Sequence, residues 1–376
     1  MEKLILVLSL VLISGSPMLN SDIFIKVSLP VYFVFLTIRY WSFLRKKYFD
    51  LASYFFLVFG FLFFIQAISY EQFQFAYISF LLKIFCGGLV IYICGKDFIG
   101  LYIKSIVLLS IISIPFYFLQ LVIGPDSFPS LVKTFSEEYE LKSILIHTVV
   151  PSDEFRNSGF AWEPGALQGF INLALFFSLV DRKKYYPGGW GVFWMVLALV
   201  STFSTTGYVV LAMISIYYVF IFNSKIFRLA LLPIVAFVLV VLYTQISFIG
   251  EKIESQLDDS VNTEEFFGAR FSSFNFDKIY FLSSPIIGNG FVEETRWRFH
   301  PDFHGRNLGH GNGFTDFLVS VGLIGFFCYF YKTFKSFGMV GSPWFLILML
   351  VVMLQGEHFL NLVLFLGLPF VRVDDE

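Results

Sequence analysis

Residues 98–123 read FIGLYIKSIVLLSIISIPFYFLQLVI, an apolar stretch in which Lys104 is the one charged residue. A stretch of this length can cross a bilayer as a helix, because about 20 apolar residues span the hydrocarbon core. The whole chain has a similar composition: 57% of its residues are hydrophobic and 14% are charged, whereas soluble domains carry about 25% charged residues. The sequence therefore predicts an all-α polytopic membrane protein and disfavours a soluble helical domain.

The chain contains about 12 apolar runs that we interpret as transmembrane helices. They cover roughly residues 4–19, 23–41, 49–69, 73–95, 98–123, 163–180, 189–203, 206–222, 229–249, 312–331, 342–355 and 358–371. The breaks near 203–206 and 355–358 leave open one bent helix at each place. The runs form an N-terminal group (1–123), a middle group (163–249) and a C-terminal group with a short tail (312–376). We interpret the first run as a retained helix rather than a cleaved signal sequence.

Basic residues in the short connections predict the orientation of these helices. They follow alternate runs, at Arg45, Lys46, Lys47, Lys96, Arg182, Lys183, Lys184, Lys225, Arg228, Lys332 and Lys335. If the runs alternate in direction, all these residues lie on one side, and the positive-inside rule makes that side cytoplasmic. Both termini are then cytoplasmic, and the two long connections, residues 124–162 and 250–311, lie on the opposite face.

The chemistry is expected on that opposite face. All five histidines fall there: His147, His300, His304, His310 and His358. Few ionisable residues lie within the runs, whereas pumps and porters place such groups near the membrane midplane. The three cysteines lie in apolar runs, so their pattern predicts neither a disulfide framework nor a cysteine metal site. A net charge of −2 gives no general attraction to nucleic acid.

The first long connection ends in RNSGFAWEP, which begins at Arg156. Arginine suits phosphate binding because its planar guanidinium donates two parallel hydrogen bonds and stays charged. Glu163 complements the dipole at a helix start, and Pro164 fits the first helical turn. The alternative is that Arg156 pairs with Asp153 or Glu154 and that the Glu-Pro pair only caps the helix.

A hydroxyl-rich turn, STFSTTG, lies between two runs and includes Ser204 and Thr205. Its hydroxyl groups could line a polar cavity and bind a head group. The alternative is that they bond to helix carbonyls and let the helices pack closely.

The second long connection gathers basic residues, at Arg270, Arg296, Arg298, Arg306, His300, His304 and His310. Such a surface attracts anions, and at a membrane face the expected anion is a lipid-linked phosphate. Histidine is the usual general base near neutral pH. A metal site built from the three histidines with Asp302 or Glu293 is the alternative, but nothing in the spacing fixes its geometry, so we predict no metal.

Taken in order, these motifs resemble the O-antigen ligase and polymerase superfamily of bacterial envelopes, and most of all its Wzy-type polymerases. The similarity covers about residues 156–325. The matching positions are Arg156, Gly159, Glu163 and Pro164; Ser204 to Gly207; Arg270, Pro285, Gly288 and Gly290; and Asn312, Gly322 and Gly325. Two positions depart from the pattern: Gly311 separates His310 from Asn312, and Thr205 and Thr206 stand where the family often has an arginine.

The resemblance implies a C-type glycosyltransferase-like membrane enzyme without metal or other cofactor. Its substrates would be undecaprenyl-diphosphate-linked repeat units, polymerised into O-antigen or capsular polysaccharide at the periplasmic face of the bacterial inner membrane. Arg156 and Arg270 would neutralise the departing diphosphate, and His310 would deprotonate the attacking hydroxyl in an inverting displacement. The identity of the base stays open among His310, His304 and His300.

The other candidates for substrate binding are Glu163, Asn312, His304, His300, Arg296, Arg298, Arg306, Ser204 and Thr205. Implied partners, besides donor and acceptor glycans and membrane lipid, are a chain-length regulator and a flippase. An O-antigen ligase, which transfers the glycan to the lipid A core, is the alternative within the superfamily, although that branch more often keeps histidine next to asparagine. A lipid-linked oligosaccharide flippase is a less favoured alternative, because it should carry charges inside the bundle.

Overall fold

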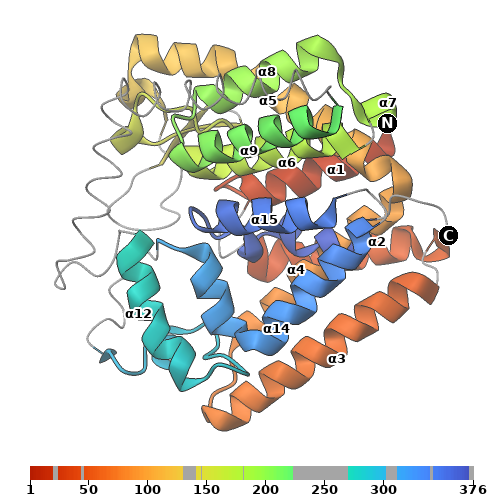
Figure 1. Ribbon diagram of the computed structural model, residues 1–376, viewed down its shortest axis with the longest axis vertical. Helices are drawn as coiled ribbons and strands as arrows, with labels where there is room; N and C mark the ends of the chain where they lie inside the picture. The colour runs from red at the N-terminus through yellow and green to blue at the C-terminus, as the bar shows by residue number, and fades with distance from the viewer. Residues whose placement is uncertain are drawn as a thin grey trace.

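Helices that run roughly parallel or antiparallel make up most of the molecule (Figure 1). In the computed structural model, the described residues are 1–19, 24–43, 46–129, 141–144, 146–180, 182–222, 270–301, 311–338 and 342–371. The α-helices among them are α1 (Glu2–Gly15), α2 (Leu29–Arg39), α3 (Lys46–Ser69), α4 (Phe75–Cys94), α5 (Phe98–Ile123), α6 (Pro164–Val180), α7 (Arg182–Tyr185), α8 (Gly188–Val200), α9 (Thr205–Phe222), α12 (Arg270–Ser283), α13 (Glu293–Arg296), α14 (Gly313–Phe337), α15 (Pro343–Leu354) and α16 (Val363–Leu366).

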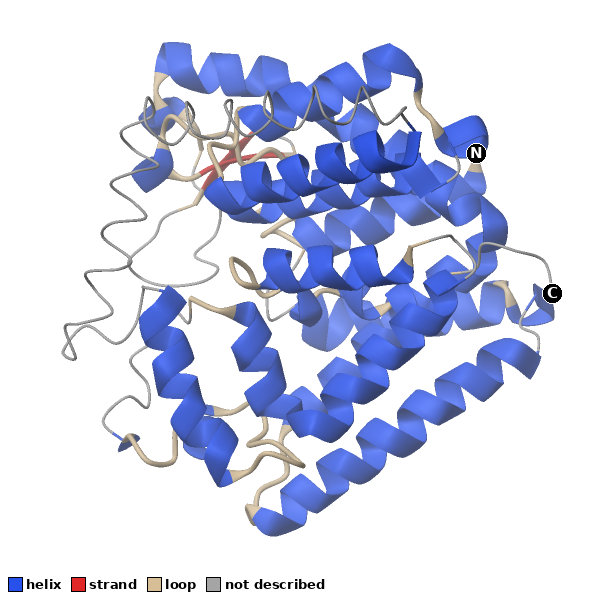
Figure 2. Ribbon diagram, viewed as in Figure 1, coloured by secondary structure: helices blue, strands red, loops and turns tan. Residues whose placement is uncertain are grey.

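Shorter elements connect these helices. They are η1 (Phe24–Ser28), η2 (Trp41–Phe43), η3 (Gly95–Asp97), η4 (Pro125–Ser127), η5 (Pro151–Asp153), η8 (Phe359–Asn361) and η9 (Leu368–Phe370). The strands β1 (Lys142–Ile144) and β2 (His147–Val149) form an antiparallel hairpin, coloured red in Figure 2. The two long connections therefore contain regular structure, the hairpin in the first and α12 with α13 in the second, which the sequence did not predict.

The apolar helices have the character of membrane-spanning elements. Within the described residues, three segments are long and apolar enough to cross a bilayer: Tyr48–Ser69, Phe75–Ile123 and Gly313–Phe337. On α3, large apolar side chains such as Phe56, Leu57 and Phe61 are more than half exposed. Contiguous apolar surface of this kind fits lipid better than water. The structure thus supports a mostly helical membrane protein, whereas the predicted count of 12 spans is not established and the run at 229–249 lies outside the described residues.

The last predicted span, residues 358–371, is wrong. This segment forms η8, α16 and η9, three short turns that are too small to cross a bilayer. Its backbone packs directly on α4, because a Cβ added at Gly87 would lie 2.1 Å from the Val363 carbonyl oxygen. Nearly all of its residues are buried. The apolar run therefore fills the protein interior, and hydropathy alone cannot separate that from a lipid-facing helix.

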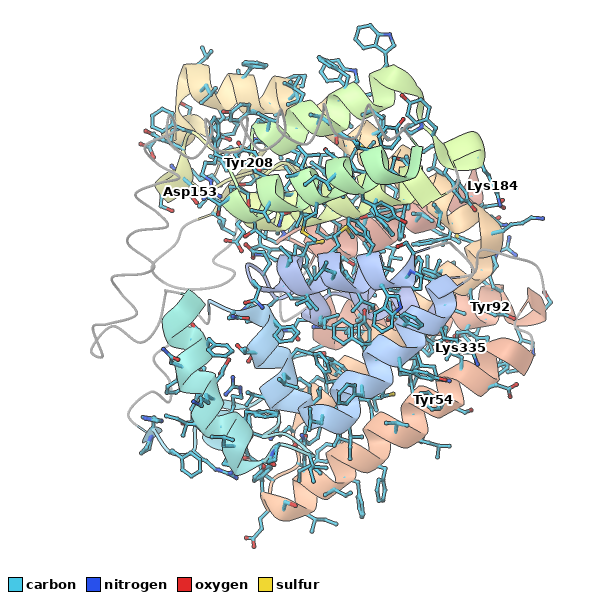
Figure 3. All side chains as sticks on the ribbon, in the orientation of Figure 1. Tyr54, Tyr92, Asp153, Lys184, Tyr208 and Lys335 are labelled. Carbon is cyan, nitrogen blue, oxygen red and sulfur yellow. The ribbon has the colours of Figure 1, made fainter. Side chains whose placement is uncertain are left out.

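The two ends of the helices carry different parts of the chain. Figure 3 shows Lys184, Tyr92 and Lys335 at one end, which we call the lysine end, and Asp153 and Tyr208 at the other, which we call the motif end. The N-terminus lies at the lysine end (Figure 1). The hairpin and α12 lie at the motif end (Figure 1, Figure 2). Lys184 and Lys335, two of the basic residues that predict one common side, thus lie at the same end, and the orientation in a membrane stays a prediction.

Two glycine motifs form a single joint in the fold. Gly322 has a φ of 62° and breaks the regular helix of α14. The turn from Pro285 to Gly290 fills the break: the Leu323 amide donates to the Pro285 carbonyl at 2.9 Å, and the Gly290 amide donates to the Ser320 carbonyl at 3.1 Å. The Gln66 side chain of α3 donates to Ser320 O at 2.8 Å and thereby ties α3 to the joint. Gly322 was identified in the sequence only as a position that matches the family pattern, and this interruption of the helix was not predicted.

Replacing Gly322 by alanine should lower the stability of the protein strongly. A Cβ there would lie 2.4 Å from the Ile286 carbonyl oxygen, and the positive φ is itself unfavourable by about 1–3 kcal/mol for other residues. Thermal unfolding of the purified protein in detergent measures the effect. Gly338→Ala is the matched control, since a Cβ there has nothing within 4 Å. Equal melting temperatures for the two variants would contradict the close contact between Gly322 and the turn from Pro285 to Gly290.

Candidate functional site

Arg156 lies at the motif end on the turn between η5 and α6, with a side chain that is 12% exposed. Its Nε donates to the Thr202 carbonyl at 3.0 Å, and its Nη1 donates to Asp153 Oδ2 at 2.9 Å. Within the described part of the chain, Nη2 makes no hydrogen bond. The predicted pairing with Asp153 is therefore confirmed, and the guanidinium keeps one nitrogen whose N–H groups could donate to a ligand.

The turn that carries Arg156 is held by α5. Tyr117 donates its hydroxyl to the Phe155 carbonyl at 2.9 Å, and Gln120 donates its amide to the Glu154 carbonyl at 2.6 Å. Buried backbone carbonyls need such partners, since leaving one unsatisfied costs free energy comparable to a lost hydrogen bond. The backbone that carries Arg156 is consequently held against α5.

Asn157 joins the Arg156 turn to the hydroxyl-rich turn. It is fully buried, and its Nδ2 donates to Ser201 Oγ at 2.8 Å while its backbone amide donates to the Ser201 carbonyl at 2.9 Å. Its Oδ1 accepts from the amide of Gly159, whose φ of 52° closes the turn. Two motifs that lie about 45 residues apart in the sequence are thus one structural unit.

Ser204 and Thr205 begin α9. Ser204 Oγ accepts a hydrogen bond from the Gly207 amide at 3.3 Å, as expected for a helix N-cap, and the Ser204 side chain is buried. Thr205 is half-buried at the first helical position. Phe203, just before them, has a positive φ of 46°, which is uncommon for a residue with a side chain. The turn therefore satisfies its helix end locally. The bonds to helix carbonyls that the packing alternative predicted are made by Ser201 and Thr202, which donate to the Ala198 and Leu199 carbonyls at 2.9 and 2.7 Å.

Glu163 lies at the start of α6. Its backbone carbonyl accepts from the Ala166 amide at 3.2 Å, and its Oε1 accepts from Trp162 Nε1 at 2.8 Å. The next residue but one, Gly165, packs against the Glu357 carboxylate, since an added Cβ would lie 1.9 Å from its Oε1. Glu357, which is 8% exposed, was not identified from the sequence, although it interrupts an otherwise apolar C-terminal region.

Asn312 caps α14. Its Oδ1 accepts from the amides of Phe314 at 3.1 Å and Thr315 at 3.2 Å, and its Nδ2 donates to Gln355 Oε1 at 2.9 Å. The neighbouring Gly313 lies against the backbone carbonyl of Glu357. The segment around residues 355–358 therefore contacts the beginnings of both α6 and α14. This places the Glu163 and Asn312 motifs beside one another.

A chain of charged side chains extends from this point into the second long connection. Arg296 Nη2 donates to Asp277 Oδ1, and Arg296 Nε donates to Asp316 Oδ1 at 3.3 Å. The other oxygen of Asp316 lies 3.2 Å from His358 Nδ1. Burial opposes the charge of Arg296, but the carboxylates of Asp277 and Asp316 outweigh it and raise its pKa. We call these four residues the charge chain.

The charge chain changes the interpretation of Arg296. Its side chain is 4% exposed and lies inside the protein, not on a surface that attracts anions. The sequence reasoning missed both of its carboxylate partners. Asp316 could have been found, because it is the one charged residue in the apolar run at 312–331. Asp277 gave no such signal, since it lies in a polar stretch.

His300 and Arg298 lie beside α12. His300 Nδ1 is 2.7 Å from the Tyr280 hydroxyl, and burial raises the pKa of Tyr280 to about 12, so that hydroxyl keeps its proton. Arg298 Nη2 donates to Ser283 Oγ at 2.9 Å, with the guanidinium 5.1 Å from the Tyr70 ring centroid. Both side chains thus attach the segment that follows α13 to α12.

The remaining predicted residues cannot be placed fully. Arg270 begins α12, but its side chain lies outside the described residues, as do His304, Arg306 and His310 entirely. No group of three or more histidine, cysteine, aspartate or glutamate side chains suited to a metal ion occurs among the residues that are described.

His147 is a buried histidine that supports the Arg156 turn. Its Nε2 lies 3.1 Å from Gln120 Oε1, which can only accept, so Nε2 carries the proton. Nδ1 is buried without a hydrogen-bond partner in the described structure. Burial lowers the pKa of His147 to about 4, so the ring is neutral at pH 7 and is unsuited to act as a base on a ligand.

The pH dependence of stability should reveal the neutral His147. The unfolded state binds a proton below about pH 6.5, whereas the folded state resists it until about pH 4, so stability is complete above pH 6.5 and falls as pH decreases. At pH 5 the loss is about 2 kcal/mol. The melting temperature should therefore fall more between pH 7.5 and 5 in the wild type than in His147→Gln. Parallel curves for the two proteins would contradict a buried neutral imidazole.

Comparison of the chain with protein-family models, with curated proteins and with solved structures finds no match. The resemblance described above therefore depends on the sequence motifs alone.

Proposed function

We propose that this protein is a membrane glycosyltransferase that polymerises undecaprenyl-diphosphate-linked oligosaccharide repeat units into O-antigen or capsular polysaccharide. The observation that carries this proposal is the meeting of separate sequence motifs at one end of the helices. Asn157 bonds to Ser201, which joins the first two motifs. Glu357 contacts both Gly165 and Gly313, which joins the helix starts of α6 and α14.

The reaction assigned to this site is a single inverting displacement. The acceptor hydroxyl attacks the anomeric carbon of the donor sugar, the bond from that carbon to the diphosphate oxygen breaks, and undecaprenyl diphosphate leaves with the electron pair. Arg156 would donate from Nη2 to this leaving group, and Arg270 at the start of α12 would supply a second positive charge. Fixed donors aimed at developing charge are among the largest contributions to catalysis.

A base must accept the proton of the attacking hydroxyl. His310 remains our proposal from the sequence, and His358 is a second candidate. Its Nδ1 lies 3.2 Å from Asp316 Oδ2, and a carboxylate in this position orients an imidazole and stabilises its protonated form. His358 is 31% exposed at the side chain, whereas His147 is buried. Separate His310→Ala and His358→Ala variants would distinguish the two.

We also propose that the motif end faces the periplasm and the lysine end faces the cytoplasm of a bacterial inner membrane. The support is that Lys96, Lys184 and Lys335 all lie at the lysine end, because the positive-inside rule places an excess of basic residues on the cytoplasmic side. Both termini would then be cytoplasmic.

The proposal is tested by an elongation assay with purified protein in proteoliposomes, supplied with a synthetic undecaprenyl-diphosphate-linked repeat unit. A ladder of longer lipid-linked glycans on a gel is the expected result. Transfer only to an added lipid A core would establish the ligase instead. Translocation of the lipid-linked glycan with no new glycosidic bond would overturn the enzyme proposal and favour the flippase.

A further inference from the structure

A hollow of about 500 Å³ lies at the lysine end. Lys184, one of its lining residues, is at the opposite end of the helices from Asp153 and Tyr208 (Figure 3). It lies where the first turn of α1, the turn η3, the first turns of α5 and the short helix α7 meet. Its charged lining consists of Glu2, Lys3, Lys96, Asp97, Lys104 and Lys184. We call it the lysine hollow. Its volume lies in the usual range for ligand pockets, about 300–1,000 Å³.

The lysine hollow carries an excess of positive charge. Four lysines against two carboxylates give a net charge of +2. Both carboxylates already have cationic neighbours: Asp97 Oδ2 lies 3.0 Å from Lys3 Nζ, and Glu2 Oε1 lies 3.4 Å from Arg39. Positive charge concentrated in a concave site raises the local concentration of anions.

The hollow also opens onto apolar surface. Leu4 and Leu101 form part of its lining. Along α5, Lys104 is followed one turn later by Leu108 and then by Ile111, so all three lie on one face of the helix. Leu108 is 43% exposed and Ile111 is 38% exposed. A cationic hollow thus continues into an exposed apolar strip that points along the membrane-spanning direction of α5.

We propose that the lysine hollow binds the phosphate head group of an anionic phospholipid, with its acyl chains lying along Leu108 and Ile111. Basic pockets between helices at the membrane boundary have the chemistry that such head groups need. Lys104 and Lys184 contact the phosphate from two sides, α5 and α7. The apolar strip distinguishes a lipid from free phosphate, which would use the lysines alone. This site is independent of the proposed glycosyl transfer.

The test is native mass spectrometry of the full-length protein in detergent, titrated with phosphatidylglycerol, phosphatidylcholine or inorganic phosphate. Phosphatidylglycerol should bind more tightly than phosphatidylcholine. The double variant Lys104→Gln/Lys184→Gln should weaken phosphatidylglycerol binding about 10- to 30-fold. The matched control, Lys332→Gln/Lys335→Gln, removes the same charge at the same end but outside the hollow and should bind as the wild type does.

A third variant, Leu108→Ser, distinguishes binding of a phospholipid from binding of free phosphate. It should weaken phosphatidylglycerol binding and leave any phosphate binding unchanged. Three results would each overturn the lipid assignment. The first is equal binding of the two lipids, and the second is unchanged phosphatidylglycerol binding by the Lys104/Lys184 double variant. The third is competition by inorganic phosphate together with no effect of Leu108→Ser on lipid binding. Melting temperatures of all variants, measured alongside, identify any that have lost the fold, and Lys104→Gln alone then replaces the double variant.

Discussion

Replacing Arg156 by alanine should reduce the rate of glycan elongation about 100- to 1,000-fold, the usual effect of removing one fixed donor to developing negative charge. Arg156 is held in place by Thr202 and Asp153, so its Nη2 keeps a defined direction without further reorganisation. Arg156→Lys should recover only part of the rate. Lysine keeps the charge but cannot donate to the Thr202 carbonyl and a phosphate in the same planar arrangement.

The measurement is initial-rate elongation of a lipid-linked repeat unit in proteoliposomes. Lys142→Gln is the matched control, because Lys142 is another partly buried cation on the same connection, paired to Asp126 at 2.7 Å. It should change the rate less than about threefold, as expected for a pair whose carboxylate is solvent-exposed. If Arg156→Ala is as active as Lys142→Gln while Arg156→Lys is folded, Arg156 has only the structural role of closing its turn.

Long apolar helices could be predicted from the sequence with small errors at their ends. The expected run at 98–123 is helix α5 with the same limits, and the runs at 163–180 and 206–222 correspond to α6 and α9. Hydropathy succeeds there because a long apolar segment in a membrane must form its own hydrogen bonds as a helix. The run at 358–371 failed because it folds as three short turns, and hydropathy alone does not distinguish buried turns from a buried helix such as α6.

The candidate site was predictable only where its contacts are local. The pairing of Arg156 with Asp153 spans three residues and was among the predicted alternatives. The contacts of Arg296 with Asp277 and Asp316 span 19 and 20 residues and depend on how α12, α13 and α14 pack. Glu357 meets Gly165 across almost 200 residues, and no local pattern signals such a contact. Long-range partners of this kind follow from the tertiary fold.

The charge chain yields the largest predicted effect on stability. Replacing Arg296 by methionine should destabilise the protein by about 3–5 kcal/mol, because it leaves a buried carboxylate without its cation. Asp277 is 1% exposed, so water cannot replace the guanidinium without opening the contact between α12 and α14. Denaturant-induced unfolding of the purified protein in detergent measures the loss. Arg298→Met is the matched control, and it should cost less than about 1 kcal/mol.

A compensating variant distinguishes loss of the ion pair from loss of packing. Arg296→Met combined with Asp277→Leu removes both buried charges together, and such replacements often recover or exceed the original stability. The double variant should therefore be more stable than Arg296→Met alone. It should still elongate glycans slowly if Arg296 also holds Asp316 toward His358, because that carboxylate then loses its second contact. A double variant no more stable than Arg296→Met would mean that the aliphatic part of Arg296, rather than its charge, holds α12 in place.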